Sequence, residues 1–409
     1  MHWGLIVVGG GIGGAALATV MARKGKSVLM LEQSTVFQDR VRGEWIAPWG
    51  VVETKRLGLY DCLVQAGGHH LTRHVSYDEL LPPEMAEAHV LPLGMFAEGV
   101  PGPLCIGHPH HCQTLFDEAK RAGVQTVRPA QVTSVTLGAR PSVTYLADGA
   151  EHVAEGDLIV GAEGRVSVVR ATSGMTLHQD TPHHWFGGLL VSGVAGWDDD
   201  LQAIGTEANL GFLVFPQGKG RVRVYGGYAL AEKNRFSGPE GARRFLDAFS
   251  MRSCPKNQHV VDGTPAGPLF SYINSDSWTD APYADGMVLV GDAAGWNDPI
   301  IGQGLSITYR DVRIVTDILA ATPVGAKPDF RPYAEERAER MRRLRFAAQL
   351  TSVLDMEFGE AAAARRLSYH QRRATDPTLG MHGLAAMAGP ENTPAEVFTE
   401  AHRARVLQG

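Results

Sequence analysis

The chain has 409 residues, of which 44% are hydrophobic and 20% charged, and its formal net charge is −6. This is the composition of a globular protein with room for two or three hydrophobic cores, and the acidic balance argues against a nucleic-acid partner. The four cysteines, Cys62, Cys105, Cys112 and Cys254, form no C-x-x-C pair, which argues against a disulfide framework and favours a cytoplasmic location.

The first apolar segment, Trp3 to Ala22, is uncharged and long enough to be weighed as a membrane span. It contains six glycines, however, and its apolar residues divide into a strand-like run and a helix-like run. A signal peptide would require a lysine or arginine before the apolar segment, and none is present. We therefore interpret the segment as a buried strand and helix, and expect no membrane association.

The N-terminal residues predict a strand, a turn, a helix and a second strand. Leu5 to Val8 is a β-branched run typical of a strand buried on both faces. Ala15 to Arg23 predicts a helix of small residues, and Ser27 to Leu31 predicts the second strand, which ends at Glu32. This order is that of a nucleotide-binding unit.

The turn carries G-x-G-x-x-G as Gly9, Gly11 and Gly14. Gly9 permits the tight turn, Gly11 lets the backbone approach a pyrophosphate, and Gly14 lets the helix pack closely on the strand. Glu32 stands 23 residues after Gly9, where an acid binds a ribose 2′-hydroxyl and repels a 2′-phosphate. The segment predicts a site for FAD or NAD rather than NADP.

Two further strand–turn–helix patterns follow. Asp157 to Arg170 contains the turn Glu163-Gly164, with Ser167 before the helix. Near the end of the chain, the apolar run Met287 to Val290 precedes Gly291-Asp292, and Leu305 to Leu319 predicts a helix. Between Gly291-Asp292 and this helix lies the motif P-x-x-G-x-G, formed by Pro299, Gly302 and Gly304.

In this order and spacing, the motifs resemble those of the single-component (group A) FAD-dependent aromatic hydroxylases of the para-hydroxybenzoate hydroxylase type. The resemblance implies an α/β fold: a GR2-type Rossmann-like FAD-binding domain, an inserted, mostly antiparallel β-sheet substrate domain and a helical C-terminal region. We expect the FAD-binding domain at residues 1–75, 100–175 and 282–330, the substrate domain at 76–99 and 176–281, and the C-terminal helices at 331–409. Gly9 and Asp292 then lie on two walls of one FAD site.

The resemblance implies specific roles at that site. Asp292 would accept hydrogen bonds from the ribityl hydroxyls, and Pro299 would lie beside the isoalloxazine ring and position it. The helix beginning near Gly302–Gly304 would direct its positive end at the flavin's pyrimidine edge. The full set of expected cofactor-binding residues is Gly9, Gly11, Gly14, Glu32, Arg42, His108, Glu163, Gly164, Asp292, Pro299, Gly302 and Gly304.

Some of these positions leave an alternative open. Arg42 could be a solvated loop charge, and His108 an ordinary residue at a helix start. Glu163 is one methylene longer than the aspartate usual in the family, and Ser306 replaces a frequent asparagine.

The middle of the chain predicts the substrate domain. Trp185–Val191, Leu210–Phe215 and Arg221–Tyr228 have strand-like composition, and the alternating charges of the last predict one wet face. A short strand is expected within Ala88–Pro101 and an outer helix at Pro239–Met251. Phe212, Tyr225 and Tyr228 are candidate substrate-pocket residues, with Trp185, Phe186 and Phe215 weighed beside them; the alternative for each is ordinary core packing.

After Asp329 the chain is helical and rich in arginine. Arg337 and Arg340 alternate with glutamates, which favours a solvated helix with i,i+4 ion pairs. The histidine pairs His69-His70, His110-His111 and His183-His184 lack the spacing of metal ligands, and we expect no metal.

The resemblance implies an FAD-dependent monooxygenase that uses NADH or NADPH as a transient co-substrate and O₂. It would hydroxylate an aromatic or similarly electron-rich small molecule through a flavin C4a-hydroperoxide, and the sequence assigns no side-chain base. The alternatives are an FAD-dependent dehydrogenase or reductase, and a non-catalytic flavoprotein that binds a small molecule. A flavin-dependent halogenase is less favoured because W-x-W-x-I-P is absent, and a plain NAD dehydrogenase would leave Asp292 and Pro299 unexplained.

Overall fold

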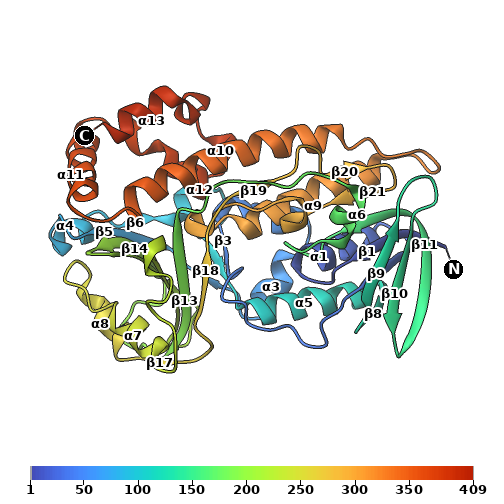
Figure 1. Ribbon diagram of the computed structural model, residues 1–409, viewed down its shortest axis with the longest axis horizontal. Helices are drawn as coiled ribbons and strands as arrows, with labels where there is room; N and C mark the ends of the chain where they lie inside the picture. The colour runs from blue at the N-terminus through green and yellow to red at the C-terminus, as the bar shows by residue number, and fades with distance from the viewer. Residues whose placement is uncertain (1, 409) are drawn as a thin grey trace.

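The computed structural model describes residues 2–408. Its two large sheets lie side by side, and the C-terminal helices run along the top of Figure 1 across both. The nucleotide-type sheet is at the right of this view and the second sheet at the left. The termini lie at opposite ends of the long axis.

The first sheet has the strand order β20-β21-β11-β1-β2-β8, and β9 and β10 extend it beside β11. β1 pairs in parallel with both β11 and β2, and β21 pairs in parallel with β11. The carboxyl ends of β1, β11 and β21 therefore meet at one edge, which brings the three predicted motifs together. The strands are β1 (His2–Val8), β2 (Val28–Leu31), β8 (Gln125–Val127), β9 (Gln131–Thr136), β10 (Ser142–Ala147), β11 (Ala150–Gly161), β20 (Tyr283–Ala284) and β21 (Met287–Leu289).

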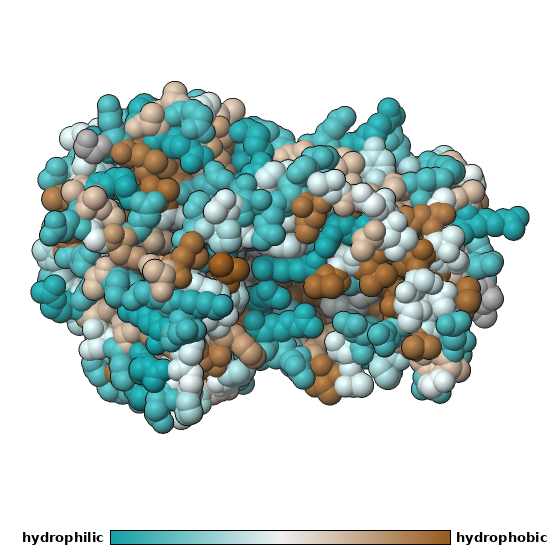
Figure 2. All heavy atoms as spheres, viewed as in Figure 1, coloured by the Kyte–Doolittle hydropathy of each residue, from teal (hydrophilic) through white to brown (hydrophobic). Residues whose placement is uncertain are grey.

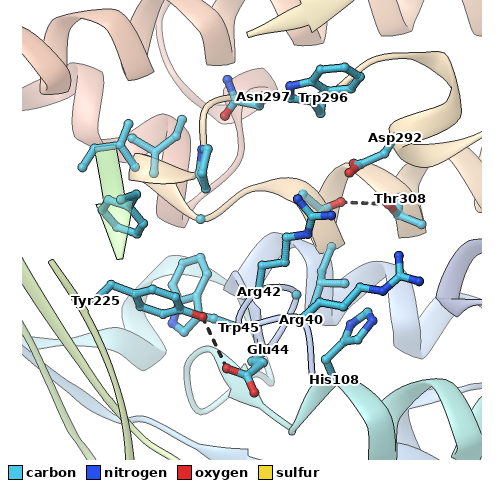
Figure 3. Close-up of a pocket in the computed structure, with 18 of the residues that line it drawn as sticks. Arg40, Arg42, Glu44, Trp45, His108, Tyr225, Asp292, Trp296, Asn297 and Thr308 are labelled. Atoms are coloured by element: carbon cyan, nitrogen blue, oxygen red, sulfur yellow. Dashed lines mark hydrogen bonds between the residues drawn. The ribbon is translucent and has the colours of Figure 1, made fainter. Parts of the chain in front are cut away.

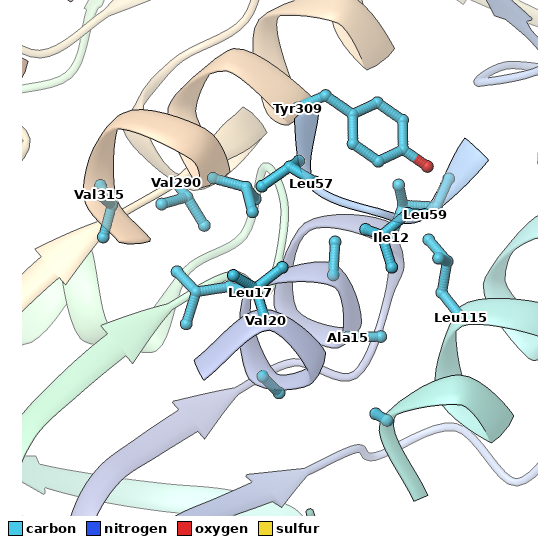
Figure 4. Close-up of a cluster of buried hydrophobic side chains, with 14 of the residues drawn as sticks. Ile12, Ala15, Leu17, Val20, Leu57, Leu59, Leu115, Val290, Tyr309 and Val315 are labelled. Carbon is cyan, nitrogen blue, oxygen red and sulfur yellow. The ribbon is translucent and has the colours of Figure 1, made fainter. Parts of the chain in front are cut away.

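Three helices cover one face of this sheet: α1 (Ile12–Arg23), α5 (His108–Arg121) and α9 (Gly304–Ala321). Figure 4 shows their shared core, in which Leu17 and Val20 of α1 lie near Val315 of α9 and Leu115 belongs to α5. The segment weighed as a membrane span is thus β1 and α1, as predicted. No helix within residues 2–408 is long and apolar enough to cross a membrane.

The second sheet has the order β17-β13-β16-β15-β14-β5-β6, with β18 also on β13. Its pairs are antiparallel except β14 with β5. The sequence did not predict β14. The strands are β5 (Arg73–Asp78), β6 (Leu91–Pro92), β13 (His184–Ser192), β14 (Leu201–Glu207), β15 (Leu210–Pro216), β16 (Arg221–Ala229), β17 (Thr264–Pro265) and β18 (Phe270–Ile273). α7 (Gly241–Asp247), shorter than expected, and α8 (Gln258–Val261) follow on this sheet's outer side.

The remaining elements connect and cover the sheets. Short strands form β3 (Trp45–Ile46), β4 (His69–His70), β7 (Leu104–Cys105), β12 (His178–Gln179) and β19 (Ser277–Trp278). The other α-helices are α2 (Pro48–Arg56), α3 (Tyr60–Gln65), α4 (Pro83–Glu87), α6 (Val168–Ser173), α10 (Arg331–Asp355), α11 (Glu360–Thr375), α12 (Leu384–Met387) and α13 (Glu400–Leu407). Turns of 3₁₀-helix include η1 (Leu93–Phe96), η4 (Gly291–Ala294), η5 (Pro299–Ile301) and η6 (Pro377–Gly383).

The wet face predicted for β16 is wrong. This strand lies between β13 and β15, and Arg223 is only 1% exposed. Its guanidinium donates to Asp39 at 2.7 Å and to Glu44 at 2.8 Å. The charged residue Arg223 can be buried in this strand because two carboxylates from a distant loop neutralise it.

The solvated surface predicted for the arginine-rich helix is also wrong in part. Two of its ion pairs do run along α10, Arg340 with Glu336 and Arg343 with Glu339. Arg337 and Arg340 are nevertheless buried, because both pair with Asp311 of α9. Buried ion pairs with Asp311 therefore hold α10 against α9, which covers the first sheet.

Candidate active site

One cavity of about 940 Å³ lies between the two sheets and the C-terminal helices. The space-filling view shows a waist between two lobes, where hydrophilic side chains gather around a hollow (Figure 2). The carboxyl edge of the first sheet forms one end of the cavity, and β5, β14, β15 and β16 of the second sheet contribute to its walls. The three strand–turn–helix motifs thus open into the same space.

The glycine turn after β1 forms a cradle at one end. A Cβ at Gly14 would lie 1.9 Å from the Gly9 carbonyl oxygen, so α1 approaches β1 as closely as the sequence predicts. A Cβ at Gly11 would instead meet nothing within 4 Å, because this residue faces open cavity. The N-terminus of α1 is therefore accessible to a phosphate.

Glu32 lines the cavity at the end of β2. Its carboxylate accepts hydrogen bonds from the backbone N–H groups of Gly10 and Ser34, each at 2.7 Å. The acid thus holds the glycine turn in place.

The loop after β21 forms the opposite wall. Gly291 has φ +62°, a left-handed conformation that favours glycine, and its N–H donates to Asp311 at 2.9 Å. Arg337 donates to Asp311 and to the carbonyl oxygens of Ala294 and Gly295. A buried ion pair therefore fixes the loop that presents the next residue, Asp292, to the cavity.

Positive charge gathers between these walls. Figure 3 shows Arg42 extending toward Asp292 from the loop after β2, with Arg40 beside it and His108 below. Asp292 is 3.3 Å from Arg165, but within residues 2–408 no carboxylate lies within 4.0 Å of Arg40 or Arg42. Burial and the Arg165 charge lower the pKa of Arg42. Arg40 and Arg42 thus form no ion pair among the described residues, and this part of the cavity is suited to an anionic group.

His108 begins α5 and borders the same space. Burial lowers the pKa of His108 to about 4, so its imidazole is neutral near pH 7. Its Nδ1 atom is buried and has no hydrogen-bond partner among the described residues. A buried polar atom of this kind requires a partner, which a bound group at the cavity wall would supply.

The third wall is the turn from η5 into α9. Gly302 has φ +68° and packs against the Trp45 ring, and α9 begins at Gly304, whose missing side chain leaves open space. Pro299 and both glycines line the cavity, so the positive end of α9 faces it. Ser306 is turned elsewhere: its hydroxyl accepts a hydrogen bond from the Ala47 N–H.

The middle motif has a structural as well as a lining role. Glu163 accepts hydrogen bonds from the Val169 N–H and the Ser167 hydroxyl, so its longer side chain reaches the start of α6. Burial raises the pKa of Glu163. Glu163 and Gly164 both border the cavity, and Gly164 has the left-handed φ of +78°.

Aromatic side chains line the cavity beyond Pro299. Tyr225 stacks on Phe186 with ring centroids 5.4 Å apart and contacts Phe215 edge-on. Its hydroxyl donates to Glu44 at 3.3 Å, the dashed contact in Figure 3. Glu44 in turn pairs with Arg223. We call the aromatic residues of this part of the cavity the aromatic chamber: Trp45, Phe186, Phe215, Tyr225 and Tyr272.

Of the pocket candidates, Tyr225 and Phe212 border the cavity, and Tyr228 does not. Phe212 is fully buried and packs against Tyr77, whereas Tyr228 packs against Phe236 in the outer core. The expectation for Tyr228 is wrong because residues three apart in a strand point to opposite faces. Trp185 likewise borders no part of the cavity, and its indole N–H donates to Leu230.

The cavity fits FAD. An open glycine cradle, two unpaired arginines and an unpartnered buried histidine nitrogen surround a space that ends at an aromatic chamber. Sequence reasoning missed Asp311, Glu44 and the C-terminal residues Asp355, Met356, Tyr369 and Arg373, which it treated only as parts of helices or loops. These residues carry no local motif.

The comparisons with known proteins agree with this geometry. Residues 4–348 match the model of the FAD binding domain family, and the chain belongs to that family. Squalene epoxidase erg1 of Aspergillus fumigatus is 24% identical over 348 residues, which are 79% of this chain and 67% of that protein. 6-Hydroxynicotinate 3-monooxygenase of Bordetella bronchiseptica is 26% identical over 365 residues, with coverages of 83% and 89%.

Length and structure comparisons add two facts. The chain spans less than two thirds of two plant relatives, 59% of squalene epoxidase 3 from Arabidopsis thaliana and 58% of squalene monooxygenase SE1 from Panax ginseng. The solved structure of p-nitrophenol 4-monooxygenase PnpA from Pseudomonas putida matches with a TM-score of 0.76 at 17% identity, covering 100% of this chain and 99% of that one. The predicted fold class and the family resemblance are confirmed: the chain is a member of the FAD binding domain family and has the fold of an FAD-dependent oxidoreductase.

Proposed function

We propose that the protein hydroxylates a small, electron-rich aromatic compound, using O₂ and NADH or NADPH. The supporting observation is that one cavity joins the glycine cradle to the aromatic chamber, so a ring can lie against a flavin without a barrier between them. The names of the Bordetella and Pseudomonas proteins describe them as monooxygenases of 6-hydroxynicotinate and of p-nitrophenol.

The proposed cofactor contacts follow the walls of the cavity. Gly9, Gly11 and Gly14 would present the α1 N-terminus to the pyrophosphate, with Glu32 at the adenosine ribose. Arg42 and His108 would contact the phosphate side, Asp292 the ribityl chain, and Glu163-Gly164 the adjoining wall. Pro299, Gly302 and Gly304 would hold the isoalloxazine edge.

Bound FAD supplies the redox chemistry that activates O₂. The chain's own contribution is to place the ring, exclude water and manage protons. Phe186, Phe215 and Tyr225 provide an apolar surface on which an aromatic ring stacks, and burial there keeps water from the reacting atoms.

We assign the proton path from a phenolic substrate to Tyr225 and Glu44. Burial raises the pKa of Tyr225 well above its ordinary value, so its hydroxyl stays protonated and donates to the Glu44 carboxylate. The Tyr225 oxygen can then accept a hydrogen bond from the substrate hydroxyl. As that proton leaves the substrate, the tyrosine proton moves toward Glu44, and the Arg223 guanidinium fixes the carboxylate in position.

Flavin absorbance tests the proposed function. The purified holoprotein is mixed with NADH or NADPH, with and without a panel of phenols and aromatic acids, and bleaching and O₂ uptake are recorded. We expect one compound to accelerate bleaching and to be recovered with an added hydroxyl group. Bleaching without oxygen transfer would identify a dehydrogenase or reductase instead, and a flavin that never bleaches would identify a binding protein.

A further inference from the structure

The cavity does not end at the aromatic chamber. Met356 packs with Phe186 and Tyr225, and beyond it the cavity continues between β5 and the C-terminal helix α11. The face of α11 that carries Tyr369, His370 and Arg373 lines this distal end. We call it, together with Asp355 at the end of α10, the distal subsite.

Most charges near the distal subsite already have partners. Asp78 of β5 is 3.2 Å from Arg366 and 3.1 Å from His370, and it also accepts from the Leu80 N–H. Arg366 makes a second ion pair, at 2.9 Å, with Glu79. These groups hold α11 against the second sheet and leave little capacity for a ligand.

Two opposite charges in the distal subsite are unpaired. Within residues 2–408, the Asp355 carboxylate makes no hydrogen bond and lies within 4.0 Å of no cationic group. Burial and the nearby Asp78 raise the pKa of Asp355 to about 6, while Arg366, His370 and Arg373 oppose that rise. A half-buried carboxylate without a partner gains from any cation that reaches it.

Arg373 is the second unpaired charge. No carboxylate of residues 2–408 lies within 4.0 Å of it, although it is near enough to affect the pKa of Asp355. Its guanidinium passes directly over Gly380, where a Cβ would lie 2.6 Å from Nε. Arg373 therefore lies beside the cavity with its guanidinium over Gly380, and its solvent-exposed side chain has no carboxylate partner among residues 2–408.

We propose that the distal subsite binds the zwitterionic α-amino acid group of an aromatic substrate, with the ammonium at Asp355 and the carboxylate at Arg373. This assignment rests on the proposed function, since it places the ring of the same molecule in the aromatic chamber. Two charges of opposite sign that line the same end of the cavity and form no ion pair with each other match a ligand end that carries both complementary charges. A simple anion would face the Asp355 carboxylate, and a simple amine would leave Arg373 unpaired.

Binding to the oxidised holoprotein tests this inference without NAD(P)H. Two matched series are titrated while the flavin absorbance is recorded: L-tyrosine, tyramine and 3-(4-hydroxyphenyl)propionate, and L-tryptophan, tryptamine and indole-3-propionate. In at least one series we expect the amino acid to bind about tenfold tighter than both of its partial analogues. Equal or tighter binding of the amine or of the acid overturns the inference, and so does the absence of binding by both amino acids.

Two variants separate the charges. Asp355→Asn is expected to remove the preference for the amino acid over the acid, and Arg373→Gln the preference for the amino acid over the amine. Glu357→Gln is the control, because Glu357 pairs with Arg365 and does not line the cavity. Loss of the same preference in both variants, or in the control, contradicts separate roles for the two charges.

The outcomes distinguish this inference from the proposed function. A protein that binds the amino acid by these two charges but transfers no oxygen overturns only the hydroxylase. A protein that hydroxylates simple phenols and shows no preference for the amino acid overturns only the distal subsite.

Discussion

Asp311 is the buried residue on which the flavin-side loop depends most. Its carboxylate accepts from the Gly291 N–H at 2.9 Å, from Arg337 at 3.1 Å and from Arg340 at 2.7 Å, and its side chain is fully buried. Asp311→Asn keeps the volume and one acceptor but removes the charge between two buried guanidinium groups. Breaking such a pair from one side costs about 3–5 kcal/mol.

The lower part of that range is expected for Asp311→Asn. Arg337 keeps the Ala294 carbonyl at 3.0 Å, and Arg340 keeps the Ile307 carbonyl at 3.1 Å, so neither guanidinium loses every partner. If the cost of about 3 kcal/mol falls on the loop after β21, the dissociation constant of FAD rises about 100-fold. Titration of the apoprotein with FAD, followed by flavin fluorescence, measures this change.

The matched control is Asp317→Asn on the same helix. Asp317 pairs with Arg313 at 3.0 Å, but its side chain is 60% exposed, so its loss should cost less than about 1 kcal/mol. Thermal unfolding of both apoproteins shows whether the change is local or global. If Asp311→Asn retained FAD as tightly as Asp317→Asn, the buried pair would not be what orders the loop.

Three further predictions concern the cradle, the aromatic chamber and the loop before Pro299. Gly14→Ala should destabilise even the apoprotein, because its Cβ would lie 1.9 Å from the Gly9 oxygen, whereas Gly11→Ala should leave apoprotein melting unchanged and weaken only FAD binding; equal melting of the two variants would contradict this. Tyr225→Phe should retain FAD but slow phenol hydroxylation about 10-fold or more. Tyr228→Phe should retain FAD and leave the rate of hydroxylation unchanged, and stopped-flow turnover compares the two variants. Burial raises the pKa of Asp298 to about 7, so the contribution of this group to wild-type stability should decline as pH rises from about 4 toward 7, because only the unfolded carboxyl ionises in that range. The melting temperature of Asp298→Asn relative to wild type should therefore rise over that range and then level off. A melting-temperature difference independent of pH would refute the assignment.

The sequence predicts those parts of the site whose geometry is local. Gly9, Gly11 and Gly14 define a turn within one strand–turn–helix unit, and parallel strands bring the carboxyl ends of β1, β11 and β21 to a common edge. Each of these features requires only short-range spacing and a general rule of parallel sheets. The resemblance to the hydroxylase family implied that the two distant glycine motifs share one site, and the parallel pairing of β11 with β1 and β21 is the physical reason.

Contacts between distant segments were not predictable in the same way. Glu44 and Arg223 are 179 residues apart, and the alternation around Arg223 favoured a solvated strand until the partner carboxylate was located. The prediction of a solvated helix around Arg337 and Arg340 failed for the same reason, because their partner Asp311 is on another helix. In both cases a charge pattern typical of a surface was neutralised inside the protein by a group that no local pattern identifies.

The error at Tyr228 differs in kind. Tyr225 and Tyr228 are on one predicted strand, and alternation alone assigns them to opposite faces. Alternation separates the two residues but does not say which of them meets the cavity. The structure selects Tyr225, which borders the chamber, and buries Tyr228 beside Phe236.

The most direct test of the central claim is to run the reaction under ¹⁸O₂ with the holoprotein, NADH or NADPH, and the compound that accelerates flavin bleaching. The proposed function predicts a product that carries one ¹⁸O atom, formed with matching consumption of reduced nicotinamide. A product without ¹⁸O, or oxidation of the substrate with no oxygen gained, would contradict a monooxygenase and show that this FAD site serves a different oxidation.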